Sequence, residues 1–221
     1  MVAYDDCFPC FVTVIHGKAG HVYACEWNPY AIEALRFNLQ DNRVLDRSTV
    51  FQGDSRTLVA EHKLEGRMDR VSLGLLPSSE GGWNAAIQAL RRDRGGWLHI
   101  HANVVAKEIG DWALWLCSRL ADSVAKLDDR STEVDWAVLC THIEKVKSFA
   151  PTVNHYVADV CVGPYNTVEM TSKTVGCIVT SEGVATLIPE GSQVRVPSCA
   201  LSPDGALHQS WMRDIIQEDA D

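Results

Sequence analysis

Short apolar runs alternate with segments of helical hydrophobic spacing along the chain, and no other feature constrains the fold as much. Residues 21–25 form one apolar run, and an Asn-Pro pair at residues 28–29 follows it. Asn is a favoured N-cap and Pro a favoured first helical residue, so a helix is expected to begin there. Apolar residues then recur every three or four positions over residues 32–39, and Asp41 and Asn42 end the helix.

The alternation continues to residue 127. Further strands are expected at residues 49–51, 71–75 and 97–100, and further helices at residues 83–90 and 112–127. Two more extended runs, residues 136–147 and 156–162, are joined by a link that contains Pro151, which predicts an antiparallel hairpin. Strands that alternate with helices imply a mostly parallel sheet covered on both faces. The predicted fold is therefore α/β and Rossmann-like, with a mostly parallel sheet closed by an antiparallel hairpin, and it ends near Pro164.

Residues 165–221 differ from the rest in composition. They hold 8 acidic and 3 basic residues and many turn formers. A short hairpin over residues 175–187 and a helix over residues 206–217 are the elements expected there. Because acidic, turn-rich segments bury little apolar surface, this tail is expected to add little to the core.

Composition excludes several functional classes. The net charge is −9, so net charge alone does not favour binding of nucleic acid. No run of about 18 apolar residues is present, so no helix is expected to span a membrane. The opening carries Asp5 and Asp6 where a signal peptide needs positive charge. Eight scattered cysteines suit reduced thiols in a cytoplasmic protein.

Two acidic residues stand at equivalent strand ends, about one β-α unit apart. Glu26 ends the first predicted strand, and Asp54 with Ser55 follows the second. Ligands of open α/β sheets bind at the carboxyl ends of strands, where a carboxylate can accept both hydrogen bonds of a ribose diol. Asp54 would then accept from the adenine amine. The alternatives are a surface glutamate in a capping turn and an aspartate in a turn formed by Gly53.

The loop after the third predicted strand, residues 76–80, would also face a ligand at this edge. Pro77 and Ser78 are its candidate substrate-facing residues. The alternative is helix capping by Ser78 or Ser79, with Glu80 in the first turn. Enzymes that methylate exocyclic amines often have Asn or Asp before this proline, and Leu76 at that position argues against such methylation.

Other chemistry-bearing residues have weaker signals. His99 and His101 alternate on one strand, but no nearby Cys or carboxylate completes a metal site, so structural histidines are favoured. A lone C-x-x-C pair at residues 7–10 has no matching second pair, and no metal is expected. Lys145 and Lys147 are expected on one face of a strand, as phosphate contacts or, more simply, as a solvated edge.

Five segments resemble the catalytic domain of the tRNA wybutosine-synthesizing protein 2 family, which is related to the tRNA guanine-N1 methyltransferases. They are HVYACEWNPYAIEALRFNLQDN (21–42), FQGDSR (51–56), DRVSLGLLPSSEGGW (69–83), GGWLHIHANV (95–104) and HIEKVKSFAPTVNHYVADV (142–160). The similarity covers residues 21–164, about two thirds of the chain. ACEWNP, LGLLPSSE and VKSFAP are its most specific motifs.

The resemblance implies a class I S-adenosylmethionine-binding fold and an unusual transfer. The family moves the 3-amino-3-carboxypropyl group of S-adenosylmethionine to the tricyclic base 4-demethylwyosine of phenylalanine tRNA, and methylthioadenosine leaves. Carried over by motif, Glu26 is the ribose-binding acid, Asp54 and Ser55 are the adenine-side pair, and Pro77 and Ser78 face the acceptor. No residue is assigned to the catalytic step itself.

The family has a glycine-rich loop after its first strand, whereas the matching stretch here, residues 4–11, holds no glycine. Side chains there would obstruct the methionine arm, so weak cofactor binding is expected. We expect residues 1–164 to be a truncated S-adenosylmethionine-binding catalytic domain without the family's N-terminal region, and residues 165–221 an acidic C-terminal tail. Two alternatives stay open: a tRNA methyltransferase with the same cofactor, and a non-catalytic remnant or interaction protein.

Overall fold

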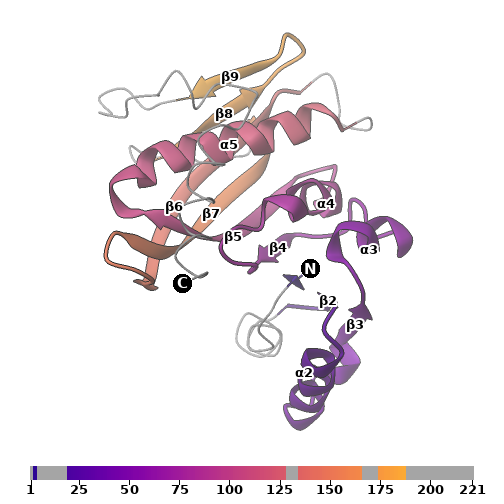
Figure 1. Cartoon of the computed structure of the whole chain (residues 1–221). Coiled ribbons are helices and arrows are strands. Elements are labelled where there is room, and N and C mark those ends of the chain that lie inside the picture. The colour runs from indigo at the N-terminus through magenta and orange to yellow at the C-terminus, as the bar shows by residue number, and fades with distance from the viewer. Residues whose placement is uncertain (1, 4–18, 128–133, 166–173, 188–221) are drawn as a thin grey trace. The chain divides into compact units, whose positions relative to one another are not determined.

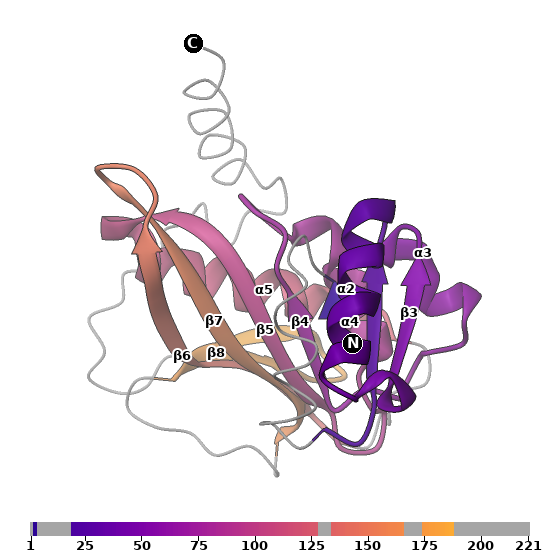
Figure 2. The ribbon, with the colours of Figure 1, turned by 90° about the horizontal axis from the view of Figure 1, so that it is seen from below.

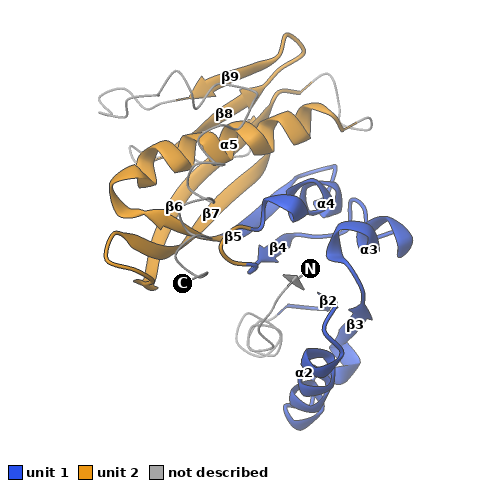
Figure 3. Ribbon diagram, viewed as in Figure 1, with its two compact units in different colours: residues 1–75, 79–100 blue, residues 76–78, 101–221 orange. Residues whose placement is uncertain are grey.

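A computed structural model of the chain describes residues 2–3, 19–127, 134–165 and 174–187. They form two compact units (Figure 3). The first contains residues up to 75 and residues 79–100, and the second contains residues 76–78 and those from 101 onward. Strand β5 (Gly96–Val105) runs through both, with its first half in the first unit and its second half in the other.

The first unit is built on parallel strands in the order β3-β2-β1-β4-β5 (Figure 1). Besides β5, these are β1 (Val2–Ala3), β2 (Val22–Glu26), β3 (Ser48–Gln52) and β4 (Arg70–Leu73). Each strand expected over residues 21–100 is present. Because the strands are parallel, their carboxyl ends lie at one edge of the sheet, which is where a ligand site is expected.

Helix α2 (Pro29–Asp41) shows how closely local signals set the boundaries in this unit. Asn28 is its N-cap, and its Oδ1 accepts from the Tyr30 N–H at 3.0 Å, while Pro29 takes the first helical position. Its buried face is Ile32, Leu35 and Leu39, as the spacing predicts. Two shorter helices, α3 (Ser55–Glu61) and α4 (Trp83–Ala89), and the 3-10 turns η1 (Leu45–Arg47) and η2 (Glu80–Gly82) complete the unit.

The second unit is mostly antiparallel, in the order β5-β7-β6-β8-β9 (Figure 2). Strands β6 (Trp136–Ser148) and β7 (Val153–Pro164) form the predicted hairpin, which is thereby confirmed. The long helix α5 (Ile109–Ala125) follows the 3-10 turn η3 (Ala106–Glu108) and packs against β6 and β8. Its apolar face includes Leu116 and Leu120, both fully buried. The predicted fold class, α/β with a parallel sheet and a closing hairpin, is confirmed.

The expectation that the chain adds little to the core after residue 165 is wrong for residues 175–187. They form the predicted hairpin, β8 (Val175–Val179) with β9 (Val184–Leu187), and β8 also pairs with β6. Cys177 and Val179 are buried. The expectation was based on the acidic composition of residues 165–221 as a whole, and it did not allow for the short apolar strand β8 within them. The helix expected over residues 206–217 lies outside the described residues.

Two bulges in β6 change which face its side chains occupy. Register shifts fall between Cys140 and His142 and between Lys145 and Lys147. Lys145 lies opposite Tyr156 and Lys147 opposite His155, and successive residues of β7 point to opposite faces. The prediction that Lys145 and Lys147 share one face is therefore wrong, because it assumed regular alternation.

In the part of the chain that the structure describes, no helix combines the length and the apolar character needed to cross a membrane.

Candidate functional site

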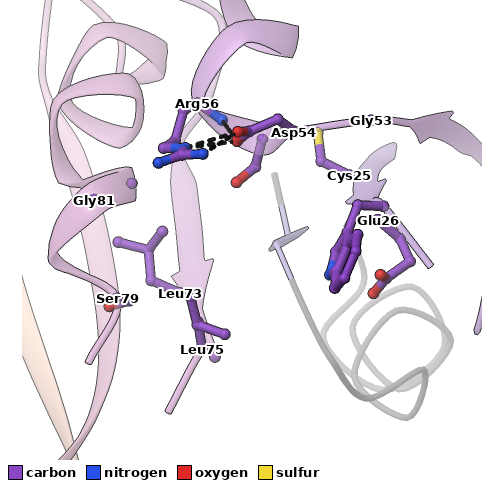
Figure 4. A pocket seen from close by; sticks show the side chains of 13 residues that line it. Cys25, Glu26, Gly53, Asp54, Arg56, Leu73, Leu75, Ser79 and Gly81 are labelled. Atoms are coloured by element: carbon purple, nitrogen blue, oxygen red, sulfur yellow. Dashed lines mark hydrogen bonds and ion pairs between the residues drawn. The ribbon is translucent and has the colours of Figure 1, made fainter. Parts of the chain in front are cut away.

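A cavity of about 450 Å³ lies in the first unit, where β2, β3 and β4 end (Figure 4). Its lining comes from four short segments: residues 25–27 at the end of β2, residues 53–56 after β3, residues 73–75 at the end of β4, and residues 79–82 before α4, from which Ser79, Gly81 and Gly82 contribute. Glu26, Asp54 and Ser55 are all among the lining residues, so the structure brings together the three cofactor-binding candidates.

Glu26 is buried at the wall of this cavity, with only 6% of its surface exposed. Its Oε1 accepts from the Asn28 N–H at 2.7 Å. None of the residues that the structure describes is found to donate to Oε2. The alternative of a surface glutamate is wrong, although the capping-turn contact to Asn28 is real. A carboxylate that keeps acceptor capacity inside a cavity can receive hydroxyl donors from a ligand.

Gly53 fixes the adjoining turn between β3 and α3. Its N–H donates to the backbone carbonyl of Glu26 at 2.9 Å, which joins the ends of β2 and β3. Its φ is +148°, a conformation that residues with a side chain rarely adopt. The turn therefore fixes the position of Asp54, which stands two residues after the end of β3.

Asp54 is the N-cap of α3, and its carboxylate is engaged by Arg56. Oδ1 accepts from the backbone N–H of Arg56 at 2.9 Å, and the Arg56 Nε–H lies 2.9 Å from Oδ1 and 2.8 Å from Oδ2. These hydrogen bonds hold the pKa of the Asp54 carboxyl below its ordinary value. The expected adenine contact of Asp54 must share the carboxylate with this guanidinium, which points at it in Figure 4. Ser55 is the first residue of α3.

Several lining residues were not anticipated. Arg56 follows Asp54 by two positions in the sequence. Because a helix N-cap brings residues at this spacing together, the spacing was the available signal for the Asp54–Arg56 contact. Trp27 and Leu75 line the cavity while remaining 73% and 51% exposed, respectively. Large apolar residues beside predicted strand ends were a second signal in the sequence. Cys25 is buried, and burial raises the pKa of its thiol to about 11, so it contributes a neutral, apolar surface.

Pro77 and Ser78 do not line this cavity. Both belong to the second unit, where the Pro77 carbonyl accepts from the Asn103 N–H at 3.0 Å and Ser78 forms an antiparallel bridge with Ala102. Their substrate-facing role stays a prediction. The neighbouring Ser79 does line the cavity, and its Oγ accepts from Trp83 Nε1 at 3.2 Å. The capping alternative is confirmed in position, because Ser79 is the N-cap residue of η2 and Glu80 lies in its first turn, but the Ser79 side chain makes no capping hydrogen bond.

The histidine candidates have protein partners. His99 Nε2 lies 3.1 Å from Arg70 Nη1, and His101 Nδ1 lies 3.0 Å from His155 Nε2. Among the residues described, no group of three or more His, Cys, Asp or Glu side chains is arranged to hold a metal ion. The C-x-x-C pair and the glycine-free stretch of residues 4–11 lie outside the described residues.

The geometry defines a Rossmann-like protein with a ligand cavity at the carboxyl ends of its parallel strands, walled by one buried carboxylate. Residues 7–125 match the model of the TRM5/TYW2 methyltransferase domain. The match covers more than half of the chain, so the chain belongs to this family.

Curated relatives agree with this assignment. The chain is 48% identical over 147 residues to tRNA wybutosine-synthesizing protein 2/3/4 of Arabidopsis thaliana, covering 66% of this chain and 14% of the relative. It is 39% identical over 172 residues to the tRNA wybutosine-synthesizing protein 2 homolog of Danio rerio, covering 66% and 41%, respectively. The chain thus spans less than half the length of these relatives.

Solved structures show the same fold. TYW2 of M. jannaschii, in complex with AdoMet, has a TM-score of 0.59 at 23% identity and covers 74% of this chain and 68% of that one. TYW2 of P. horikoshii, in complex with MeSAdo, has a TM-score of 0.57 at 23% identity and covers 73% and 56%, respectively.

Proposed function

We propose that the chain is a tRNA-modifying transferase that moves the 3-amino-3-carboxypropyl group of S-adenosylmethionine to the tricyclic base of phenylalanine tRNA in wybutosine biosynthesis. Three findings support it: the cavity, the family and the names of the relatives. The single observation that carries it is Glu26, a buried carboxylate with acceptor capacity at the end of β2 in a cavity large enough for a nucleoside.

The lining of the cavity fits the nucleoside part of this cofactor. Glu26 Oε2 would accept from the vicinal ribose hydroxyls, because a carboxylate offers acceptors and no donor. Cys25, Leu73 and Leu75 supply apolar surface for a flat base. Asp54 and Ser55 lie at the neighbouring strand end, where we propose they hold the adenine side.

The bound sulfonium would supply an electrophilic methylene carbon, and methylthioadenosine would be its leaving group. This chain's residues would bind and orient the donor so that this carbon, rather than the methyl, meets the acceptor in line. Leu76 before Pro77 supports this choice, because the position lacks the Asn or Asp that holds a target amine for methylation. The MeSAdo bound to TYW2 of P. horikoshii is the same kind of molecule as the part of the cofactor that aminocarboxypropyl transfer would leave behind.

Domain limits and compartment are part of the proposal. We propose that the cofactor-binding domain extends past residue 164 to the end of β9, because β8 pairs with β6. The cysteines that the structure describes are free thiols, among them the buried Cys25, Cys117, Cys140 and Cys177. Free thiols suit a reducing compartment, so we place the protein in the cytoplasm.

Label transfer tests the proposal. The chain is incubated with full-length phenylalanine tRNA that carries the tricyclic base and with S-adenosylmethionine labelled either in the methyl or in the carboxyl group. Label from the carboxyl group should enter the tRNA and label from the methyl group should not. Entry of the methyl label alone would contradict the proposal.

The second candidate is a tRNA methyltransferase with the same cofactor. It is favoured by the description of the matching family model, which is a methyltransferase domain that covers both TRM5 and TYW2. The same pair of labels decides between the two, since each function transfers only one of them. A non-catalytic protein would transfer neither.

A further inference from the structure

The outer half of the β6–β7 hairpin extends beyond the strand that covers its inner half. Strand β8 pairs with β6 over residues 136–140, whereas residues 142–148 of β6 pair with β7 and with no other strand in the part of the chain that the structure describes. The turn between β6 and β7 lies at the far end of the hairpin from β8 (Figures 1 and 2). We call residues 142–155 the hairpin arm. It contains the motif VKSFAP (146–151), which does not contribute to the cofactor cavity.

Backbone hydrogen bonds hold the turn of the hairpin arm. The N–H groups of Phe149 and Ala150 both donate to the Val153 carbonyl at 3.0 Å, and the Val153 N–H donates to the Ala150 carbonyl at 3.2 Å. The Thr152 carbonyl accepts from the Ala106 N–H at 2.9 Å, which ties the turn to η3. The shape of the turn is therefore set within the second unit and does not need a partner to form.

Two large apolar side chains of the hairpin arm are exposed. Val146 is 50% exposed and lies in the second bulge of β6. Phe149 is 49% exposed, although its backbone is fixed by the turn. A protein that binds single-stranded nucleic acid uses aromatic rings held in this way as surfaces on which bases stack.

The two lysines of the hairpin arm are free cations. Lys145 and Lys147 are exposed, and neither forms an ion pair with a residue that the structure describes. Elsewhere in the second unit an exposed cation does find a carboxylate, as Arg119 does with Asp122 at 3.5 Å. Two cations left without a counter-charge on one short segment are available to an anionic partner.

The charge of the hairpin arm is opposite in sign to that of the chain. Residues 142–155 hold two lysines and one glutamate, a net of +1, in a chain whose net charge is −9. That glutamate, Glu144, is engaged by His142, whose Nε2 lies 3.2 Å from Oε2. A local positive segment on an acidic chain directs a polyanion to this segment rather than to the rest of the surface.

The faces that the two lysines occupy narrow the choice of partner. Lys145 lies opposite Tyr156 and Lys147 opposite His155, so the two ammonium groups extend from opposite faces of the hairpin arm. A flat acidic protein surface would meet only one of them. The phosphates of an RNA loop can lie on both sides of an inserted hairpin, and the bases of such loops splay out and stack on aromatic side chains.

Lysines on an open strand edge have a simpler explanation, because they prevent edge-to-edge pairing with another chain. The exposed side chains of Val146 and Phe149 argue against protection alone, since apolar groups beside an open edge favour association.

We propose that the hairpin arm binds a single-stranded RNA loop, with Lys145 and Lys147 each contacting a phosphate and the ring of Phe149 stacking on a base. The identity of this loop as part of a tRNA rests on the proposed function. All of the contacts are made by the second unit alone.

The salt dependence of RNA binding tests the lysines. The affinity of the chain for a fluorescent anticodon stem-loop of phenylalanine tRNA is measured by anisotropy, without cofactor, between about 50 and 200 mM salt. Lys145→Gln and Lys147→Gln should each reduce the slope of log affinity against log salt by about 0.7, the value for one phosphate contact of a single strand. Lys126→Gln is the control, because Lys126 is exposed at the end of α5, and it should leave the slope unchanged. Equal slopes in all three variants would overturn the proposal and leave the proposed function standing.

The stacking contact is tested by Phe149→Leu, which keeps an apolar side chain and removes the flat ring. We expect the stem-loop to bind about tenfold more weakly, as for the loss of one stacked base, with the salt slope unchanged. Phe37→Leu is the control, since Phe37 is 70% exposed on α2 in the first unit. Equal affinity of Phe149→Leu and the unaltered chain would overturn the stacking contact.

A further measurement uses the unaltered chain and so does not depend on the folding of a variant. Lysines are acetylated with and without stem-loop, and the modified positions are quantified by mass spectrometry. Stem-loop at about ten times its Kd should slow acetylation of Lys145 and Lys147 about tenfold and leave Lys126 unchanged. Lysines that are not protected, or a chain that does not bind the stem-loop, would overturn the proposal.

Two other outcomes separate the proposal from its neighbours. Protection of the two lysines in a chain that transfers neither label to tRNA would refute the proposed function and retain the hairpin arm as an RNA-binding element. Lysine variants that bind the stem-loop normally but self-associate in analytical ultracentrifugation would assign the lysines to protection of the strand edge, and this would overturn the proposal.

Discussion

Glu26 is the side chain on which cofactor binding depends most at the residue scale. Hydrogen bonds to a charged group are worth about 1.5–3 kcal/mol each, and Glu26→Gln replaces one acceptor oxygen by a donor. We expect S-adenosylmethionine affinity to fall roughly tenfold to a hundredfold, since about 1.4 kcal/mol is tenfold. Calorimetric titration measures this.

Glu33→Gln is the matched control, because Glu33 is exposed on α2 and does not line the cavity. It should leave affinity unchanged. Tight binding that is indifferent to Glu26→Gln would mean that the cofactor sits elsewhere.

Arg56 sets the protonation of Asp54. The hydrogen bonds from the guanidinium lower the pKa of this carboxyl in the folded chain, so their stabilising effect is present above the unfolded pKa and is lost as pH falls through the folded value. In Arg56→Ala the Asp54 pKa should return toward its ordinary value, as carboxyl-carbon NMR titration would show. Arg36→Ala, at an exposed position of α2, should leave the Asp54 pKa unchanged. An Asp54 pKa that is the same in Arg56→Ala would contradict the pairing.

At the scale of elements, β8 depends on a close approach of Gly176 to β6. A Cβ atom at Gly176 would lie 2.1 Å from the Val138 carbonyl oxygen and 2.7 Å from Leu139 Cδ2. Gly176→Ala should therefore destabilise the fold by about 1–3 kcal/mol, the usual range for overpacking. Urea unfolding measures the loss. Gly20→Ala is the control, since its Cβ would meet nothing within 4 Å. Equal stability of the two variants would show that β8 does not pack on β6.

Local signals predicted the elements well where they were strong. The Asn28 cap and Pro29 placed the start of α2 to the residue, and hydrophobic spacing placed its buried face. Strand β5 runs to Val105, beyond the predicted end at Ile100. The prediction ended too early because the second half of the strand carries His101 and Asn103 on one face and does not form an apolar run. The faces of β6 could not be predicted either, since a bulge depends on pairing with β7.

The candidate site was predictable only in part. Topology alone brings the ends of parallel strands together, so the order of strands and helices in the sequence is enough to place Glu26 and Asp54 at one edge. The engagement of Asp54 by Arg56 depends on the turn after Gly53, and the position of Pro77 depends on its contact with Asn103. The Pro77 contact is tertiary, so spacing in the sequence does not encode it, whereas the Asp54–Arg56 contact is local and its two-residue spacing is visible in the sequence.

For the whole molecule, the central claim is the identity of the transferred group. Residues 4–11 hold no glycine, so we expect the cofactor to bind weakly and the reaction to need a high concentration of it. Substituting a glycine-rich segment at residues 4–11 should raise the affinity. An affinity that does not rise would contradict the expected obstruction of the methionine arm.

The most direct measurement is the small-molecule product. The chain is incubated with S-adenosylmethionine and phenylalanine tRNA that carries the tricyclic base, and the nucleoside released is identified by mass spectrometry. Methylthioadenosine should form in proportion to modified tRNA, and Glu26→Gln should reduce it at limiting cofactor. Release of S-adenosylhomocysteine instead would mean methyl transfer and would contradict the account.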